Sequence, residues 1–270
     1  SLNSNLPILK NVLLKGISSQ IRVLATNLEI AITKIVPGKI IEEGSLTVPH
    51  SVLIQVINNL PDERINLETE GNVLIIKSDN YEAKIQGVSE EEFPLIPRIK
   101  DNNYYLKIKN SILKESLSQV LAAAQYSDWR PELNGILFDF KGDLILVGTD
   151  SFRLARKILP NNQFESNWQE EKIIVPLKTI QEVMRVLEPE SLVSIFFDKS
   201  QIVFISEDVE IISRIIDGKF PDYEVIIPNS FNTEISIEKT AFLNAVKLAS
   251  VFSGRSQDVH LEVKGDLKTL

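Results

Sequence analysis

The sequence contains no cysteine, which excludes a disulfide scaffold, a catalytic thiolate and a zinc site with cysteine ligands. Only His50 and His260 offer an imidazole. Long apolar runs are also missing, because the longest uncharged stretch, residues 44–61, is interrupted by proline, histidine and asparagine. The formal net charge of -8 argues against a chain that holds nucleic acid by bulk positive charge, although one face can still be basic.

Sequence motifs for catalysis are also absent. The chain has no phosphate-binding G-x-x-x-x-G-K-[ST], no H-E-x-x-H and no G-x-S-x-G. Glu90, Glu91 and Glu92 form an acidic cluster without a second cluster at a useful spacing, so we interpret them as a solvated loop. Asp150 and Arg153 are interpreted as a turn-capping acid and a strand cation. We therefore predict no catalytic residue, no metal and no cofactor.

The informative feature is an internal repeat. The stretch LATNLEIAI at 24–32 returns as VGTDSFRLA at 147–155, and TVPHSVLIQVINNLP at 47–61 returns as IVPLKTIQEVMRVLEP at 174–189. The spacing agrees too, since Val48 precedes Phe93 by as many residues as Val175 precedes Phe220. We infer a duplication.

A third copy begins but does not finish. Residues 102–124 have a counterpart in residues 232–252, whereas the first copy has no leading strand and helix of this kind. We predict a first domain at 1–103, a complete second domain at 104–230, and the start of a third domain at 231–270.

Each copy is predicted to combine hairpins with two helices. Alternating apolar runs flank Gly71-Asn72 and residues 198–200, a pattern typical of β-hairpins. Apolar residues at helical spacing occupy residues 112–124 and 177–187. The fold class predicted is α+β, with antiparallel sheets backed by two helices in each copy. The polar helix faces are mildly basic.

At this point the sequence resembles a known family. The segments RPELNGILFDF, GTDSFRLA, IVPLKTIQEVMRVL and DGKFPDYEVIIP are similar to the bacterial sliding clamp, the β subunit of DNA polymerase III, in the order in which that family has them. The resemblance implies three similar domains per chain and a homodimer that closes head to tail around double-stranded DNA in the cytoplasm. It also implies a chain truncated at both ends, a non-catalytic processivity factor, and no membrane association.

The resemblance implies three sets of site residues. A cleft for short peptides from the polymerase III catalytic subunit, the clamp loader, other polymerases and repair factors is expected at Leu133, Thr149, Ser151, Phe152, Arg153, Leu154, Pro221 and Ile226. The cations expected to face DNA are Lys114, Arg130, Lys178, Arg185 and Lys247. The subunit contact is expected at Val56, Ala83, Ile85, Val251 and Phe252.

The cleft departs from the family pattern in two ways. Phe152 stands where the family often has histidine, which makes that rim more apolar. The far wall, which the family builds from its C-terminal tail, is not part of the sequence. We therefore expect an incomplete cleft.

Two other classes of function stay open from the residues alone. One is a repeat-built hydrolase or nucleotide enzyme that uses Asp150, for which metal-dependent turnover is the discriminating observation. The other is a β-rich interaction protein unrelated to DNA, which would have no reason to gather Lys114, Lys178, Arg185 and Lys247 on one surface.

Overall fold

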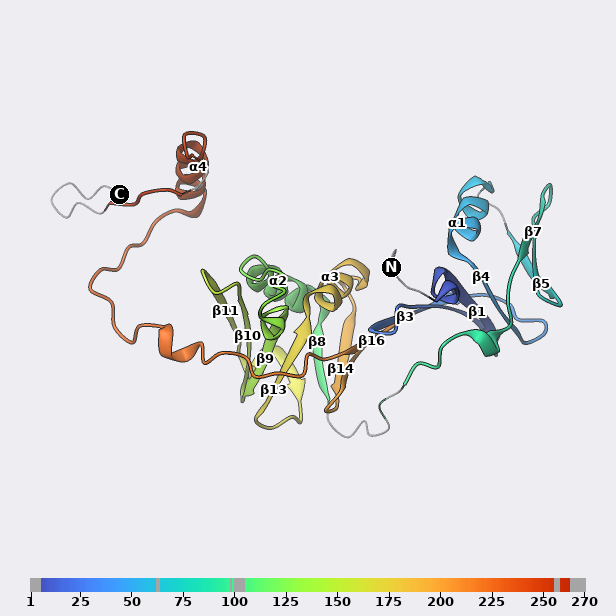
Figure 1. Cartoon of the computed structure of the whole chain (residues 1–270), viewed down its shortest axis with the longest axis horizontal. Coiled ribbons are helices and arrows are strands. Elements are labelled where there is room, and N and C mark those ends of the chain that lie inside the picture. The colour runs from blue at the N-terminus through green and yellow to red at the C-terminus, as the bar shows by residue number, and fades with distance from the viewer. Residues whose placement is uncertain (1–5, 62–63, 98, 100–104, 255–257, 263–270) are drawn as a thin grey trace. The chain divides into compact units, whose positions relative to one another are not determined.

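The alternating apolar runs form two similar arrangements of strands in the computed structural model, which describes residues 6–61, 64–97, 99, 105–254 and 258–262 (Figure 1). The elements of the first copy are η1 (Pro7–Lys10), β1 (Asn11–Ile17), β2 (Gln20–Thr26), β3 (Ile30–Pro37), β4 (Gly44–Pro49), α1 (His50–Asn59), β5 (Asn66–Glu70), β6 (Val73–Lys77), β7 (Glu82–Gln86) and η2 (Glu90–Glu92).

The second copy begins with a strand and a helix that have no counterpart among the described residues of the first. Its elements are β8 (Leu106–Lys109), α2 (Asn110–Leu121), η3 (Pro131–Leu133), β9 (Gly135–Lys141), β10 (Asp143–Thr149), β11 (Leu154–Leu159), η4 (Asn161–Gln163), β12 (Phe164–Ser166), β13 (Glu171–Pro176), α3 (Leu177–Val186), β14 (Leu192–Phe197), β15 (Gln201–Ser206) and β16 (Val209–Arg214). The predicted hairpins and helices are confirmed, as is the α+β class.

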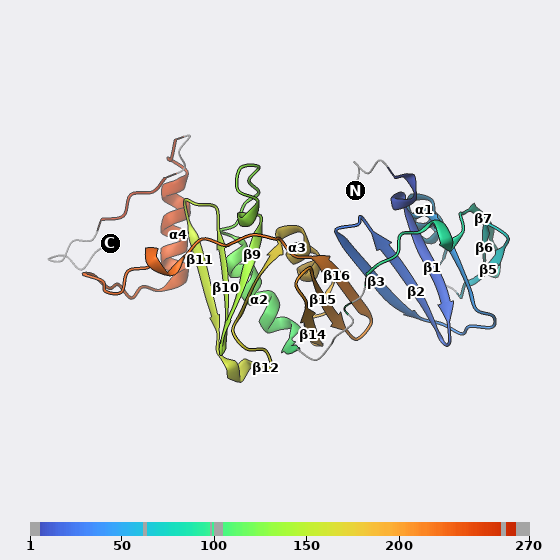
Figure 2. The same ribbon diagram turned by 60° about the horizontal axis from the view of Figure 1, so that its bottom comes forward.

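Strand order repeats between the two copies. The order β3-β2-β1-β4 in the first copy returns as β11-β10-β9-β13 in the second, and β5-β6-β7 returns as β14-β15-β16 (Figure 2). The register repeats as well, because Val12 pairs with Val48 next to Pro49, and Ile136 pairs with Val175 next to Pro176. The duplication inferred from sequence therefore extends to the hydrogen-bonded pairs.

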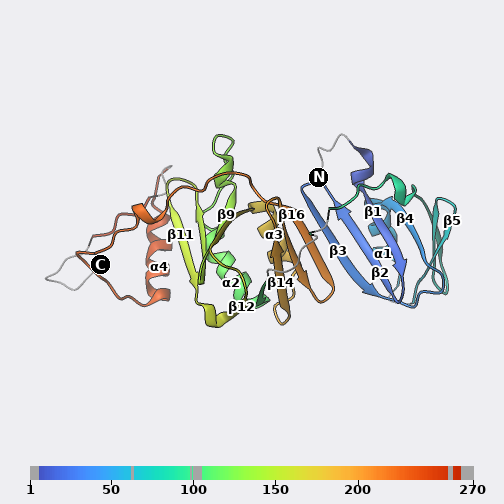
Figure 3. The ribbon, with the colours of Figure 1, turned by 90° about the horizontal axis from the view of Figure 1, so that it is seen from below.

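The two copies share one sheet. Strand β16 of the second copy pairs antiparallel with β3 of the first, which produces nine strands in the order β12-β8-β14-β15-β16-β3-β2-β1-β4 (Figure 3). Ile211 lies opposite Ile32 and Ile212 opposite Ala31, so apolar side chains cover both faces of the junction. The pairing places both copies in one compact unit, residues 1–220.

Helices α2 and α3 pack side by side over the second copy. Pro176 precedes α3 and Pro49 precedes α1, positions where the missing N–H of proline costs nothing. Lys114 of α2 donates from Nζ to the Leu187 carbonyl oxygen at 2.9 Å, just after the last turn of α3. This contact adds a cation at the negative end of the α3 dipole.

The two cores differ in size. The core cluster that contains the α2 and α3 residues has 23 buried apolar residues, five of which come from β8 and α2, whereas the matching cluster of the first copy has six among the described residues. Those five are Leu106, Ile108, Leu113, Leu117 and Val120. Helix α1 accordingly has no buried residue.

The second compact unit spans Pro221–Leu270 and contains η5 (Glu224–Ile226) and α4 (Lys239–Ser250). The helix expected from the third copy is present, but residues 232–238 form no strand, because a strand needs a partner and none is described for this segment. The predicted domain boundaries stay a prediction. Within the described residues, no helix is both long enough and apolar enough to cross a membrane.

The close crossing of α2 over β10 yields a stability prediction. A Cβ on Gly148 would lie 2.4 Å from the Val120 carbonyl oxygen and 3.0 Å from Ile136 Cδ1. Gly148→Ala should therefore destabilise the fold by about 1–3 kcal/mol. The control is Gly44→Ala in β4, where the nearest atom lies at 3.6 Å and the change should stay within about 0.5 kcal/mol. Equal urea midpoints for the two variants would contradict this close packing.

Candidate functional site

The turn between β10 and β11 carries most of the predicted cleft residues. Thr149 Oγ1 donates to the Arg153 carbonyl oxygen at 2.7 Å and accepts from the Ser151 N–H at 3.2 Å. Ser151 adopts a positive φ of 76°, which is uncommon for a residue with a Cβ and is held here by that hydrogen bond. The turn is thus fixed by its own side chains.

The same turn occurs in the first copy. Thr26 Oγ1 donates to the Ile30 carbonyl oxygen at 3.0 Å and accepts from the Leu28 N–H at 3.0 Å, and Leu28 has φ 74°. Asn27 accepts two backbone N–H groups there, as Asp150 does in the second copy. The Thr-Asn dipeptide of the first copy and the Thr-Asp dipeptide of the second therefore form the same turn.

Asp150 serves this turn and has no other described role. Its Oδ1 accepts from the N–H groups of Phe152 and Arg153, each at 3.0 Å, and its Oδ2 accepts from Arg153 Nε at 3.0 Å. The Arg153 N–H, followed by the Phe152 N–H and the Arg153 guanidinium, holds the pKa of the Asp150 carboxyl below its ordinary value against the opposing effect of desolvation. The interpretation of Asp150 as a turn-capping acid is confirmed.

A second loop lies beside the turn. Ser127 and Asn134 exchange two hydrogen bonds, of 2.6 and 3.0 Å, which close the loop that precedes β9. Arg130 in this loop donates from Nη1 to Ser151 Oγ at 3.4 Å. The structure thus connects Arg130, predicted to face DNA, to the β10–β11 turn through the loop that ends in η3. That Arg130 faces DNA stays a prediction.

The residues predicted to form the cleft differ in burial. Leu133 and Thr149 are buried, and Leu154 at the start of β11 is partly buried. Ser151, Phe152 and Arg153 are exposed, Phe152 to 98%. Pro221 and Ile226 belong to the second unit, where both are exposed.

Sequence reasoning did not select Trp129, which is 93% exposed beside Arg130. A tryptophan directly before the RPELNG segment was the available signal. A large, solvent-exposed aromatic side chain on a loop that hydrogen bonds hold in place is typical of a binding surface.

The predicted DNA-facing cations are less uniform than their sequence spacing implied. Lys178 is exposed on α3 and has no ion pair among the described residues. Arg185 donates to Glu182 Oε2 at 2.5 Å, and Lys114 is tied to α3 as described above. Helices α2 and α3 together carry three cations and two carboxylates, so their exposed faces are only slightly positive. Lys247 is exposed on α4 in the second unit.

The predicted subunit-contact residues also divide. Ala83 and Ile85 lie on β7, an edge strand of the three-stranded sheet, but Ile85 is 3% exposed and packs into the first core with Val56 and Ala83 beside it. The side chain of Ile85 therefore cannot form a surface contact in this structure, because alternation along β7 directs it inward. Val251 and Phe252 are 74% and 85% exposed after α4.

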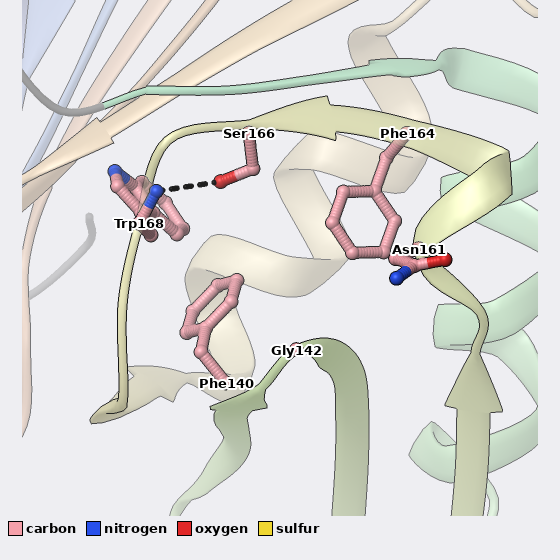
Figure 4. Close-up of a pocket in the computed structure, with 6 residues that line it drawn as sticks. All are labelled: Phe140, Gly142, Asn161, Phe164, Ser166 and Trp168. Carbon is pink, nitrogen blue, oxygen red and sulfur yellow. Dashed lines mark hydrogen bonds between the residues drawn. The ribbon is translucent and has the colours of Figure 1, made fainter.

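A pocket of about 270 Å³ lies at the other end of β10 from the turn (Figure 4). The residues that line it are Phe140, Gly142, Asn161, Phe164, Ser166 and Trp168. The rings of Phe140 and Trp168 meet edge to face at 4.4 Å, and the backbone N–H of Trp168 donates to Ser166 Oγ at 3.0 Å. No titratable group lines it. Among the residues that the structure describes, no cluster of three histidines or carboxylates could hold a metal ion.

Two family models match the chain in sequence. Residues 2–97 match the N-terminal domain of the DNA polymerase III beta subunit, and residues 107–222 match its central domain. The beta sliding clamp of Staphylococcus aureus is 30% identical over 250 residues, which covers 90% of this chain and 64% of that protein. The beta sliding clamp of Halalkalibacterium halodurans is 27% identical over 230 residues, with 83% and 60% covered. The chain thus spans less than two thirds of the length of these curated relatives.

Solved structures agree with the sequence matches. The DNA polymerase III subunit beta of Pseudomonas aeruginosa superposes with a TM-score of 0.84 at 27% identity, covering 94% of this chain and 69% of that one. The clamp of Bartonella birtlesii, solved bound to griselimycin, gives 0.84 at 26%, with 95% and 70% covered. The clamp of Helicobacter pylori, solved bound to a DNA ligase peptide, has the same fold, with a TM-score of 0.83 at 24% identity over 93% of this chain and 70% of that one.

Strand order, the repeated turn, both family models and these structures agree, and the chain belongs to the family of the DNA polymerase III beta subunit, the bacterial sliding clamp.

Proposed function

We propose that the protein acts as a processivity factor in bacterial DNA replication, as part of a cytoplasmic ring that encircles duplex DNA and tethers its partners. The observation that carries this proposal is the antiparallel pairing of β16 with β3. This pairing joins one repeat to the next by backbone hydrogen bonds and continues the sheet without a break.

The pairing can continue at both ends of the two repeats. Strand β11 of the second copy is the counterpart of β3. Strand β7 of the first copy is the counterpart of β16. Each has a strand on only one side among the described residues. A third repeat at β11 and a partner chain at β7 would use the same kind of contact, and such head-to-tail contacts form rings when the rotation closes. This geometry supports a homodimer of the full-length protein, with β7, which carries Ala83 and Ile85, at the subunit contact.

Sliding requires a weak and sequence-independent attraction to DNA. Phosphate contacts have both properties, since they carry no sequence information and weaken with salt. The exposed faces of α2 and α3 supply a slight positive charge within a chain of net charge -8. The negative charge of the remaining surface then repels nucleic acid and disfavours non-specific contact with it.

Partner binding is assigned to the surface around the Thr149–Leu154 turn. A buried apolar floor beside an exposed aromatic rim suits the apolar end of a short peptide. The Helicobacter pylori clamp, solved bound to a DNA ligase peptide, is a protein of the same fold that binds a peptide. The proposed partners are the polymerase III catalytic subunit, the clamp loader, and other polymerases and repair factors.

The alternative of an enzyme that uses Asp150 is not supported by the structure. Asp150 is committed to the turn by three hydrogen bonds, and family membership agrees with the expected absence of catalysis. The alternative of a DNA-independent interaction protein has no specific observation in its favour.

The peptide site predicts the effect of substitutions on the turn. The C-terminal peptide of a polymerase III catalytic subunit should bind the chain with a Kd of about 0.1 mM, because a short peptide held by a few apolar side chains buries little apolar area. Phe152→Asp should reduce the affinity at least about tenfold without loss of stability, because Phe152 is almost wholly exposed. Leu154→Glu should abolish binding.

Fluorescence anisotropy of the labelled peptide measures both effects. The matched control is Leu192→Glu on β14, a half-exposed leucine outside the turn, which should leave the affinity unchanged. If both turn variants bound the peptide as tightly as the unchanged chain, the turn residues would not form the peptide site and the assignment would be wrong.

The helix face predicts a salt-dependent effect. Lys178→Gln should weaken association with duplex DNA and lower the slope of log K against log salt by about 0.9, the share of one phosphate contact. Lys199→Gln removes the same charge from the exposed β14–β15 turn and should change neither. Peptide affinity should be unaffected in both variants. Indistinguishable DNA affinities for the two would argue that the α3 face does not meet DNA.

A further inference from the structure

The accessible face of α3 carries three charged side chains. Lys178, Glu182 and Arg185 lie at i, i+4 and i+7 spacing, so they share one side of the helix. Lys178 and Arg185 are exposed, and the side chain of Glu182 is 34% exposed. Helix α2 packs beside α3 and leaves these three positions accessible. The face therefore presents two cations and one carboxylate to an anionic partner.

Glu182 and Arg185 neutralise each other. Glu182 Oε2 accepts from Arg185 Nε at 2.8 Å and from Arg185 Nη2 at 2.5 Å. The side chain of Arg185 is nevertheless 69% exposed, so the pair lies at the surface. Lys178 has no ion pair among the residues that the structure describes. The two cations of α3 are thus unequal, because only Lys178 has its charge unopposed.

Helix α2 does not add to this charge. Lys114 Nζ donates to the Leu187 carbonyl oxygen, and Glu115 is exposed on the same helix. The surface of α2 is therefore close to neutral.

The matching helix of the first repeat is neutral by other means. At the three positions just described for α3, the repeat places Ser51, Gln55 and Asn58 on α1, and all three are exposed. These positions stay accessible in the second repeat with α2 in place, so the comparison does not depend on what covers the rest of α1. The carboxylate is thus present only in the helix that carries cations, and both faces have little net charge.

We propose that Glu182 attenuates the attraction between the α3 face and duplex DNA by occupying the Arg185 guanidinium. A phosphate that approaches Arg185 has to displace the carboxylate or lie beside it. Salt screens that repulsion incompletely over a few ångströms, because the Debye length is about 8 Å at physiological ionic strength. The inference rests on the proposed function, in which this face meets DNA, and it assigns to Glu182 the role of keeping the contact weak enough for sliding.

An exposed ion pair on a helix can also be purely structural, since such pairs add slightly to helix stability. A structural role predicts that Glu182→Gln and Arg185→Gln act alike, because each removes the same pair. The proposal predicts opposite effects on DNA binding. Glu182→Gln frees a cation for phosphate, whereas Arg185→Gln leaves an unpaired carboxylate that repels it.

The salt dependence of DNA affinity tests the proposal. Fluorescence anisotropy of a labelled short duplex measures the affinity of the 270-residue chain from about 50 to 200 mM salt. Glu182→Gln should steepen the slope of log K against log salt by about 0.9 and raise the affinity about five- to tenfold near 0.1 M salt, the share of one added phosphate contact. Arg185→Gln should lower the affinity. The control Glu207→Gln removes the same charge from the exposed β15–β16 turn and should leave the slope unchanged.

The double variant Glu182→Gln/Arg185→Gln separates occupation of Arg185 from a direct contact with DNA. The net charge of its α3 face equals that of the native face, so its affinity and slope should equal the native values. If Arg185 already contacts a phosphate in the native chain, the double variant loses that contact and its slope becomes shallower by about 0.9. Urea midpoints measured on the same samples show whether each variant is folded.

Two results would overturn the proposal and leave the DNA-contacting role of α3 intact. One is unchanged binding in Glu182→Gln while Lys178→Gln weakens it. The other is the loss of one contact in the double variant. If neither Lys178→Gln nor Glu182→Gln alters the slope, α3 does not meet DNA, and the proposed function of this face fails together with the role of Glu182.

Discussion

The antiparallel register between β16 and β3 is the constraint on which the rest of this unit depends. Five residue pairs, from Val209 with Lys34 to Ser213 with Ile30, join two repeats that are otherwise separate in sequence. A slip of one residue would move Ile211 and Ile32 to the opposite face of the sheet and expose them. Lys34 and Asp208 form an ion pair at one end of the register, and the apolar residues on both faces hold the remainder.

This register uses β3 of the first repeat and β16 of the second, and it leaves their counterparts β11 and β7 with a strand on one side only among the described residues. An unused edge is an aggregation hazard unless charge or curvature protects it. On β7 the outward residues Glu82 and Lys84 form an ion pair at 3.6 Å, and on β11 Arg156 is exposed. Charged edges of this kind permit a specific partner that matches them and disfavour indiscriminate strand addition. In the proposed ring, the same edges would serve both solubility and assembly.

The repeated turn shows how much of the site could be predicted from sequence. Asp150 was interpreted as a turn-capping acid because an aspartate side chain accepts backbone N–H groups nearby in sequence. Partners distant in sequence were beyond this reasoning. The hydrogen bond from Arg130 to Ser151 joins residues 21 apart in sequence, and the burial of Ile85 depends on which face of β7 meets the first core. The Glu182–Arg185 pair, three residues apart on one helix, was readable from the sequence and was missed.

The difference between the two cores bears on where stability resides. Leu113, Leu117 and Val120 of α2 are completely buried, and each apolar side chain of this kind stabilises a fold by about 1.5–3 kcal/mol. The first repeat has no described equivalent of these three, although its strand order and turn are the same. Its sheet is nevertheless continuous with that of the second repeat through β3, so the larger core supports the smaller one across the shared strands.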